Sequence, residues 1–408
     1  MNFCCRHCKT PLKNEVIDLG HQPASNSYIT KENQYEPEIK YPLKVFVCHN
    51  CWLMQIPQYI RPENLFTPDY AYLSSTSKSW CEHAKRFARD SINRLDLTKN
   101  DLVLELASND GYLLKYFSDS SIPCIGIEPT KLAADIAIKK GIKTYLNFFS
   151  FKYAESLIKN DVLFRKGVKL IIANNVVAHV PDINDFIKGI KILLHKEGFA
   201  SIEFPHLLSL LEKNQFDTIY HEHYSYFSLH SFSRIVESVG MVIDDFEYLD
   251  THGGSLRAWV THRDNSNQTR KVKDLFALEE RQGMNTLKPY EKLQKNAITI
   301  KNELLYFLLN AINSNEKIVG YGAAAKGNTL LNYAGISKDL LPFIVDKSKS
   351  KQGKYMPGSR IPILDPEELI KAEPDKVLVL PWNLIDEIKS QLGNYKLVTA
   401  VPSLKVWS

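Results

Sequence analysis

The chain has 408 residues, of which 44% are hydrophobic and 24% are charged, and its net charge is +5 at neutral pH. Because one hydrophobic core rarely serves more than about 300 residues, we expect a soluble protein of two or three domains. The lysines are spread along the chain, which argues against a dedicated nucleic-acid surface. No apolar run approaches the roughly 20 residues that a membrane span needs. Residues 1–6 also lack the apolar core of a signal peptide. We therefore expect a cytoplasmic protein in a reducing compartment, with no nucleic-acid or membrane partner.

Two pairs of cysteines share one spacing, Cys5-x-x-Cys8 and Cys48-x-x-Cys51. In a reducing compartment this spacing is typical of a metal site and not of a disulfide framework. Two such pairs supply the four thiolates of a tetrahedral zinc site. Four protein ligands leave no position for water, so the zinc is expected to be structural. A redox role for either pair is the alternative.

Residues 66–77 leave this zinc-binding stretch and are rich in hydroxyl and phenol groups. The segment has no clear periodicity. Two interpretations stay open: a solvated linker, or a loop that folds over a ligand with Tyr70 or Tyr72 pointing into a site.

An α/β nucleoside-binding unit is predicted to begin at residues 102–106, an apolar strand followed by a turn of small residues and a helix start. Such a turn can hold a nucleotide or nucleoside. Only one glycine is present, so this is not a dinucleotide fingerprint. The pattern is similar to the first motif of class I S-adenosylmethionine (SAM)-dependent methyltransferases. It marks as cofactor-binding candidates Glu105, Ala107, Asn109, Asp110 and Gly111, with Ala107 where a glycine is usual.

Three later strands are expected to bring polar groups to the same edge of the sheet. The strand 124–128 ends at Glu128 about twenty residues after the turn, where a carboxylate can accept hydrogen bonds from both ribose hydroxyls. A strand at 170–173 leads to Asn174 and Asn175. Ligands of open α/β sheets bind at the carboxyl ends of the strands, so we expect both asparagines beside the cofactor. His179 follows them, and Glu203 lies at the same edge.

Residues 220–228 concentrate two histidines, one carboxylate and three phenols. Histidine is the side chain best suited to move protons near neutral pH, and a neighbouring carboxylate can orient it. We interpret the cluster as an acid/base site at the mouth of the α/β domain. The alternative is the edge of a half-polar strand.

The C-terminal part is expected to begin with a helical segment over residues 274–313. Residues 317–329 then predict a strand, a glycine turn and a helix start around Lys326, and the strand 343–346 ends in a carboxylate. A single Gly-x-Gly is a weak indication of a dinucleotide site.

Together these motifs resemble the sugar C-methyltransferases of deoxysugar biosynthesis, which act on nucleotide-linked 4-keto-6-deoxy sugars. The resemblance covers the chain essentially end to end, including residues 70–75, 174–182, 220–228 and 252–257. It implies an α/β fold with a class I SAM-dependent methyltransferase (Rossmann-like) core. The implied domains are a zinc-binding N-terminal domain (1–70), the methyltransferase domain (71–270) and a C-terminal Rossmann-like domain (271–408) that binds no dinucleotide. We expect the last domain to hold the nucleoside diphosphate, with Lys326 and backbone amides near phosphate.

The resemblance also implies roles for individual residues. His223 would be the base that removes the proton beside the keto group. The pocket would be lined by Tyr220, Glu222, His179 and a tyrosine of the 66–77 loop, for which we name Tyr72. Removing such a proton needs a positioned base and a donor to the enolate oxygen. Either a phenol or His179 could be that donor.

The expected cofactors are therefore SAM and structural zinc. The expected substrate is a nucleotide-linked sugar of the dTDP, GDP or CDP type, methylated at a ring carbon with C3 as the expected position. A monomer is expected. Three alternatives stay open: an O- or N-methyltransferase on the same core, a zinc-dependent binding module with a decayed core, and an NAD-dependent oxidoreductase using residues 320–346.

Overall fold

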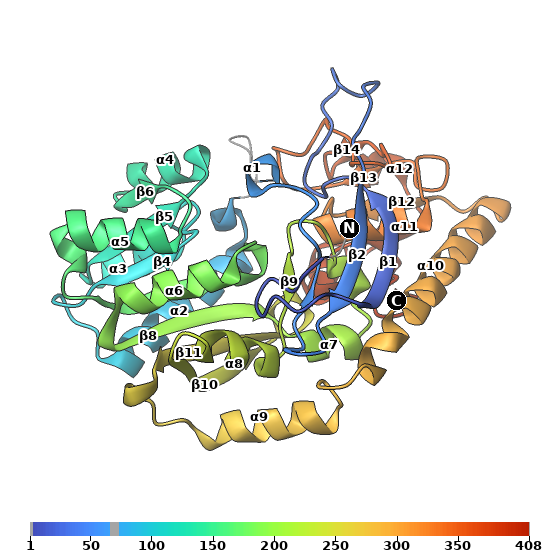
Figure 1. The fold of residues 1–408 in the computed structure, drawn as a ribbon. Coiled ribbons are helices and arrows are strands. Elements are labelled where there is room, and N and C mark those ends of the chain that lie inside the picture. The colour runs from blue at the N-terminus through green and yellow to red at the C-terminus, as the bar shows by residue number, and fades with distance from the viewer. Residues whose placement is uncertain (1–2, 66–72, 408) are drawn as a thin grey trace.

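The computed structural model describes residues 3–65 and 73–407, which form three β-sheets with helices packed around them (Figure 1). Tyr70 and Tyr72 lie outside the described residues. None of the helices in these two ranges is both long and apolar enough to cross a membrane.

The first sheet is antiparallel and joins the N-terminal segment to the middle of the chain. Its order is β1-β2-β3-β9. The first three strands are β1 (Asn14–Gln22), β2 (Tyr41–Val47) and β3 (Met54–Gln55), followed by the short helix α1 (Pro62–Leu65). The fourth, β9 (Ser225–Tyr226), comes from the histidine-rich motif and pairs with β3. The cysteine-rich segment is therefore tied directly to residues 220–228.

The second sheet is the core of the methyltransferase-like unit, in the order β10-β11-β8-β7-β4-β5-β6. The strands β4 to β8 are parallel, and β11 and β10 add antiparallel at one edge. The strand predicted at 170–173 is the fourth of this sheet along the chain, because the short β6 precedes it. The bounds are β4 (Val103–Leu106), β5 (Cys124–Glu128), β6 (Thr144–Leu146), β7 (Val168–Asn174), β8 (Leu194–Pro205), β10 (Met241–Leu249) and β11 (Ser255–His262).

Helices cover both faces of this sheet, as its almost continuously buried central strands require. One face packs against α2 (Lys78–Leu95), α3 (Leu114–Asp119) and α4 (Lys131–Lys139). The other packs against α5 (Phe151–Asn160), α6 (Ile183–Leu193) and α8 (Leu229–Glu237). The helix α6 shows the reason, because Ile183, Phe186, Ile187 and Ile190 form one buried stripe at helical spacing. The short α7 (Leu207–Glu212) follows β8.

The third sheet is C-terminal and is reached through two helices. The segment predicted as helical over 274–313 is divided into α9 (Arg270–Arg281) and α10 (Lys288–Asn313), with Gly283 at φ +74° in the break. The sheet order is β14-β13-β12-β15-β16-β17. Its elements are β12 (Ile318–Tyr321), α11 (Ala325–Ala334), β13 (Ile344–Val345), β14 (Ile363–Leu364), α12 (Glu368–Ala372), β15 (Lys376–Val379), α13 (Ile385–Gln391), β16 (Leu397–Thr399) and β17 (Lys405–Trp407).

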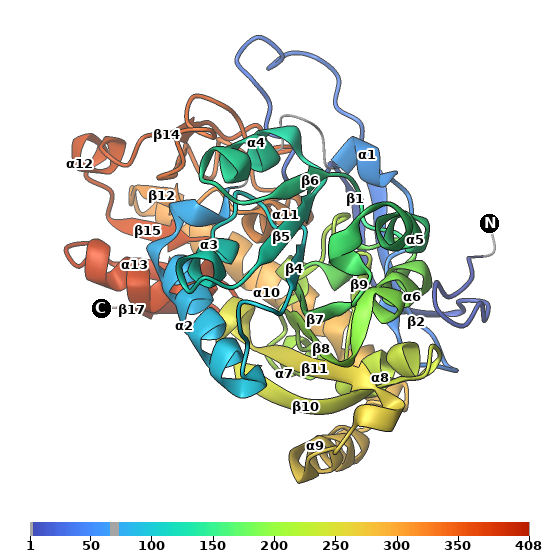
Figure 2. The same cartoon turned by 90° about the vertical axis from the view of Figure 1, so that its left-hand side faces the viewer.

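The first and third sheets contribute to one hydrophobic core, and α11 lies between β12 and β1 in Figure 2. Leu43 and Val45 of β2 belong to the same buried cluster as Ile344 of the C-terminal sheet. Phe216 and Ile219, just before the histidine-rich motif, are buried in it as well. Residues 220–228 therefore lie where all three sheets meet.

Candidate functional site

The four predicted cysteines converge on one point. The sulfur atoms of Cys5, Cys8, Cys48 and Cys51 all lie within 4.8 Å of one another, with Cys5–Cys51 and Cys8–Cys48 both at 3.5 Å. A tetrahedral zinc with Zn–S bonds of about 2.3 Å places its sulfurs about 3.8 Å apart, so this cluster fits zinc. Gln55 Nε2 donates to Cys5 Sγ at 3.2 Å, the kind of outer contact that orients a metal ligand.

The neighbours of these cysteines have other positions. Cys4 is exposed, outside the sulfur cluster. The ring of His7 pairs with Asn184 Oδ1 at 2.8 Å, and Asn184 Nδ2 donates to the backbone carbonyl of His7 at 2.9 Å. Because Asn184 lies in α6, these contacts dock the first cysteine pair onto the methyltransferase-like unit.

The loop after β4 has an unusual backbone. Ala107, Asn109 and Gly111 have φ of +51°, +50° and +73°. Left-handed conformations are costly for a residue with a Cβ and cluster at functional sites, which explains why the first position is usually glycine. The loop is closed onto β5 because Asn109 N–H donates to Glu128 Oε2 at 2.9 Å. The other oxygen of Glu128 accepts from the backbone N–H and hydroxyl of Thr130, at 2.8 and 2.5 Å.

Acceptor atoms around this loop are buried without partners among the described residues: Glu105 Oε2, Asp110 Oδ1 and Asn174 Oδ1. Burial raises the pKa of Glu105 well above its usual value, and the nearby charges of Glu128 and Asp110 raise it further. The second oxygen of Asp110 accepts from Lys140 Nζ at 3.0 Å. Unpaired acceptors beside carboxylates fit a ligand with positive charge and many donors. SAM, which carries an ammonium, a sulfonium and two ribose hydroxyls, is such a ligand, so these residues could hold it.

Asn175 is held in place by a buried charge network at the end of β8. Its backbone, at φ +56°, donates its N–H to the carbonyl of Glu203 at 2.7 Å, and its side chain donates to Glu203 Oε1 at 3.3 Å. Oε2 of Glu203 lies 3.0 Å from the Arg257 guanidinium and 3.2 Å from His83 Nε2. Burial alone would raise the pKa of Glu203, but the hydrogen bond with His83 and the charge of Arg257 lower it to about 2. His83 carries no signal in the sequence, because it is a single histidine on a helix.

The histidine-rich motif presents one oriented base. The ring nitrogen Nδ1 of His223 lies 2.9 Å from the carbonyl oxygen of Thr218, and a carbonyl can only accept, so the ring proton is on Nδ1. The lone pair is therefore on Nε2, which accepts from the hydroxyl of Tyr220 at 2.9 Å. Burial, with the nearby rings of His179 and His252, lowers the pKa of His223 well below its usual value. The ring is thus neutral at neutral pH and can accept a proton.

His179 lies beside this base, with 4.7 Å between the two ring centroids. Burial lowers the pKa of His179 to about 4, so it is neutral as well. The carboxylate of Glu222 is buried and accepts from Asn26 Nδ2 at 2.8 Å. The structure therefore brings together His223, Tyr220, His179 and Glu222, while Tyr72 lies outside the described residues.

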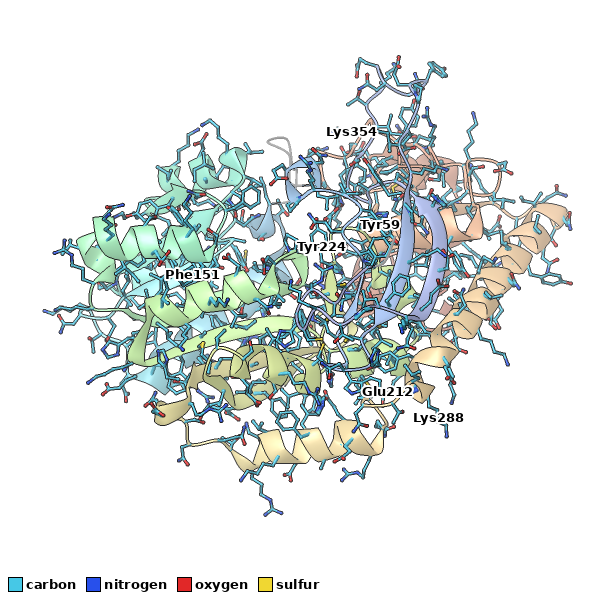
Figure 3. The ribbon with its side chains drawn as sticks, viewed as in Figure 1. Tyr59, Phe151, Glu212, Tyr224, Lys288 and Lys354 are labelled. Atoms are coloured by element: carbon cyan, nitrogen blue, oxygen red, sulfur yellow. The ribbon has the colours of Figure 1, made fainter. Side chains whose placement is uncertain are left out.

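The second histidine of the motif has a structural contact. His221 is buried, with its Nε2 3.1 Å from the carbonyl oxygen of Pro42 in β2. The strand expected as an alternative is limited to Ser225–Tyr226. Tyr224, labelled near the middle of the molecule in Figure 3, donates to the carbonyl of Ile60 at 3.0 Å. Only part of the motif therefore faces the base.

The glycine turn after β12 is closed by the protein's own groups. Three consecutive N–H groups are used: Gly322 donates to Val345 O (2.8 Å), Ala323 to Asp346 Oδ2 (2.7 Å) and Ala324 to Gly322 O (2.8 Å). The expectation that backbone amides of this turn bind phosphate is therefore wrong for these three, because each already has an acceptor. The contact from Ala323 also occupies the carboxylate of Asp346, which is the group that the ribose of a dinucleotide would use.

The side chain of Lys326 is directed away from this turn, toward Asn383 and Trp382. Its Nζ donates to Asn383 Oδ1 at 2.6 Å and lies 4.9 Å from the ring centroid of Trp382. The indole N–H of Trp382 donates to Asp217 Oδ2 at 2.7 Å. Asp217 had no sequence signal as a site residue, although it stands only three positions before Tyr220.

Three family models match successive parts of the chain. They are described as "Putative zinc binding domain" (residues 5–66), "Methyltransferase domain" (80–245) and "C-methyltransferase C-terminal domain" (250–402). The C-methyltransferase NovU of Streptomyces niveus is 32% identical over 410 residues, covering 99% of this chain and 96% of that protein.

Solved structures align with about half of the chain. The PH0226 protein of Pyrococcus horikoshii OT3 has a TM-score of 0.38 at 11% identity and covers 50% of this chain and 99% of its own. A SAM-dependent methyltransferase of Clostridium acetobutylicum ATCC 824 has a TM-score of 0.35 at 12% identity, covering 44% and 91%.

The whole-length match and the three successive family models confirm the family that the sequence resembles, its zinc-binding module and its SAM-dependent methyltransferase core. The chain belongs to the family of SAM-dependent C-methyltransferases with an N-terminal zinc-binding domain.

Proposed function

We propose that the protein methylates C3 of a nucleotide-linked 4-keto-6-deoxy sugar, through an enolate formed by a protein base, in deoxysugar biosynthesis. The observation that carries the proposal is the neutral, oriented His223, whose Nε2 lone pair meets the hydroxyl of Tyr220. Transfer of a methyl group to carbon needs a nucleophilic carbon. A ring carbon beside a ketone becomes nucleophilic when a base removes its proton.

Each residue of the histidine-rich region has a separate role in the proposed reaction. When the sugar displaces the hydroxyl of Tyr220 from His223 Nε2, this nitrogen accepts the proton from C3. Thr218 keeps the ring oriented through Nδ1. Tyr220 and His179 line the substrate side of the base. Glu222 positions the N-terminal loop through Asn26. Tyr72, which lies outside the described residues, is assigned to the same pocket by the family resemblance.

The residues that we propose for cofactor binding come from the carboxyl ends of the parallel strands. Glu105, Glu128, Asn174 and Asn175, with the backbone of the 107–111 loop, would hold SAM. When bound, SAM supplies an electrophilic methyl group. The buried, unpaired acceptors around the loop support this assignment.

The proposal includes the setting of the enzyme. We place it in the cytoplasm as a monomer, acting on a dTDP-, GDP- or CDP-linked sugar. We assign residues 1–70 to the zinc-binding domain, 71–270 to the methyltransferase domain and 271–408 to the C-terminal domain.

Solvent deuterium exchange tests the proposal. The protein is incubated in D2O with a dTDP-4-keto-6-deoxyhexose, with and without SAM, and the sugar is analysed by mass spectrometry. We expect enzyme-dependent exchange at C3 and a gain of one CH2 only with SAM. The variant His223→Asn should lose about 100-fold or more in exchange, the usual contribution of a positioned base. The exposed His21→Asn serves as the matched control.

The outcomes separate the candidate reactions. A mass gain without exchange at carbon indicates an O- or N-methyltransferase and contradicts the enolate. Full exchange by His223→Asn contradicts the assigned base. If neither exchange nor a gain is seen, GDP- and CDP-linked sugars are tried in the same assay.

A further inference from the structure

The helix α11, which follows β12 of the C-terminal sheet, contributes a cation to the region around His223. Lys326 lies in the first turn of α11, and its ammonium has three N–H donors, of which Asn383 accepts one. The face of Trp382 lies 4.9 Å away and contributes attraction without accepting a conventional hydrogen bond. Among residues 3–65 and 73–407, the recorded neighbours of this ammonium are the Asn383 side chain and the Trp382 ring, with no ion pair to a carboxylate. The protein thus holds a largely buried cation with donors to spare.

One short segment connects this lysine to the base. Asp217, which accepts from Trp382, is adjacent to Thr218, whose carbonyl orients His223. The next residue, Ile219, accepts from the hydroxyl of Thr329 in α11 at 2.9 Å. Three successive residues, 217–219, therefore connect α11 and its lysine to the catalytic ring. The ammonium is therefore linked to the ring of His223 through Trp382 and residues 217–218.

Electrostatics agree with this placement. The charge of Lys326 contributes to the lowered pKa of both His223 and His252, so the ammonium lies within electrostatic range of both rings. Burial lowers the pKa of Lys326, and the charge of Asp217 opposes part of this effect. Residues 324–326 are also partly accessible, so the lysine is not sealed in the core. The region thus contains neutral histidines, the Lys326 ammonium and the Asp217 carboxyl group, and the ammonium has N–H donors left for an anionic group of the substrate.

A substrate could bring that anion in two forms, the diphosphate or the oxygen of the enolate. The glycine turn beside Lys326 has three consecutive N–H groups that already donate to protein acceptors. A diphosphate bound at this turn would meet no free amide from those three residues. The enolate oxygen carries one charge and lies next to the carbon that His223 deprotonates, so one ammonium suffices for it.

We propose that Lys326 is a further catalytic residue, whose ammonium donates to the C4 oxygen of the sugar as the enolate forms. This inference rests on the proposed function. In the step, the C3–H bond breaks and the proton goes to His223 Nε2. The electron pair of that bond becomes the C3–C4 double bond, and the pair of the C4–O double bond moves to oxygen. The oxygen then carries the negative charge that Lys326 stabilises.

The test measures C3 exchange without SAM for wild type, Lys326→Met and Lys326→Arg. Loss of an oxyanion donor costs about 100-fold or more, so we expect Lys326→Met to lower the rate constant of exchange by about that factor. The KM for the sugar nucleotide and the Kd for dTDP should change by no more than about twofold, because the interaction forms mainly in the transition state. Lys326→Arg keeps the charge and should recover part of the rate. The exposed Lys338→Met is the matched control.

The result that overturns the inference is exchange at the wild-type rate in Lys326→Met. A higher KM and weaker dTDP binding with an unchanged rate constant also overturns it, and assigns the lysine to the diphosphate. Thermal melting and SAM binding verify folding. If Lys326→Met is not folded, Lys326→Arg is used in its place. Because its donor is displaced, we expect exchange to be about tenfold slower, which is equivalent to about one hydrogen bond in the transition state. Absence of exchange in wild type with dTDP-, GDP- and CDP-linked sugars alike refutes the proposed function itself.

Discussion

Replacing Glu203 by glutamine tests the charge network that supports the cofactor side of the site. The side chain of Glu203 is fully buried, 3.0 Å from the guanidinium of Arg257. Its other oxygen accepts from Asn175 at 3.3 Å and from Thr251 at 3.2 Å. Glutamine keeps the shape but removes the charge, so Arg257 remains buried with Glu247 as its one recorded carboxylate partner among the described residues. We expect lower stability and weaker SAM binding.

The magnitude follows from the pKa of Glu203. The surroundings lower it from 4.5 to about 2. At 1.36 kcal/mol per pH unit, this difference corresponds to about 3 kcal/mol of folding free energy at neutral pH. Breaking a buried ion pair on one side costs a similar amount, about 3–5 kcal/mol. A carboxylate with a lowered pKa contributes fully above its unfolded value, and the contribution is lost as pH falls through the folded value. The gap between wild type and Glu203→Gln should therefore be constant above about pH 5 and close between about pH 4.5 and 2.

Urea unfolding at pH 7 and pH 3 measures this gap. The matched control is Glu247→Gln, whose carboxylate lies 2.9 Å from Arg257 but is 38% exposed. An exposed partner is worth about 0–1 kcal/mol, so this control should lose much less. A loss below about 1 kcal/mol in Glu203→Gln at pH 7 would refute the reasoning, as would a gap that does not narrow in acid.

Three further tests, two of them with a control variant, concern other parts of the molecule. Burial raises the pKa of Asp217 from 3.8 to about 6, so native stability falls as pH rises through that window. Asp217→Asn should thus be about 3 kcal/mol more stable than wild type in urea unfolding at pH 8, with no difference below about pH 3.8. Ala107→Gly removes an alanine from a left-handed conformation and should stabilise the folded protein by up to about 1 kcal/mol. The control Ala84→Gly, inside α2, should destabilise the folded protein by about 1 kcal/mol. Equal shifts of the melting temperature in the two variants would contradict this expectation. Cys48→Ser should lose bound zinc by elemental analysis and melt the N-terminal sheet, while the exposed Cys4→Ser should keep it.

Much of the candidate SAM site could be predicted from the sequence because its geometry is local. Glu105 and Gly111 flank one turn between a strand and the next helix. Glu128 follows at the end of the adjacent parallel strand, as the spacing of about twenty residues requires. The paired cysteines are local in the same sense, since each Cys-x-x-Cys forms one turn. The roles of His223 and its neighbours stay predictions, although the structure places them together.

Other features depend on contacts between distant residues, which leave no periodic pattern. Glu203 and Arg257 belong to neighbouring antiparallel strands, but His83 reaches them from a helix 120 residues before Glu203. The closed glycine turn could not be foreseen either, because Gly-x-Gly reads the same whether its amides are free or bonded.

The sequence by itself determined the zinc ligands as a set, the order of the SAM-binding elements and the family, because spacing and strand–turn–helix order are properties of the chain. Only the tertiary structure decided which histidine of the motif faces the site, and that Lys326 turns from the glycine turn toward Asp217. The physical reason is that both depend on which groups are left unpaired when three sheets pack around residues 216–226.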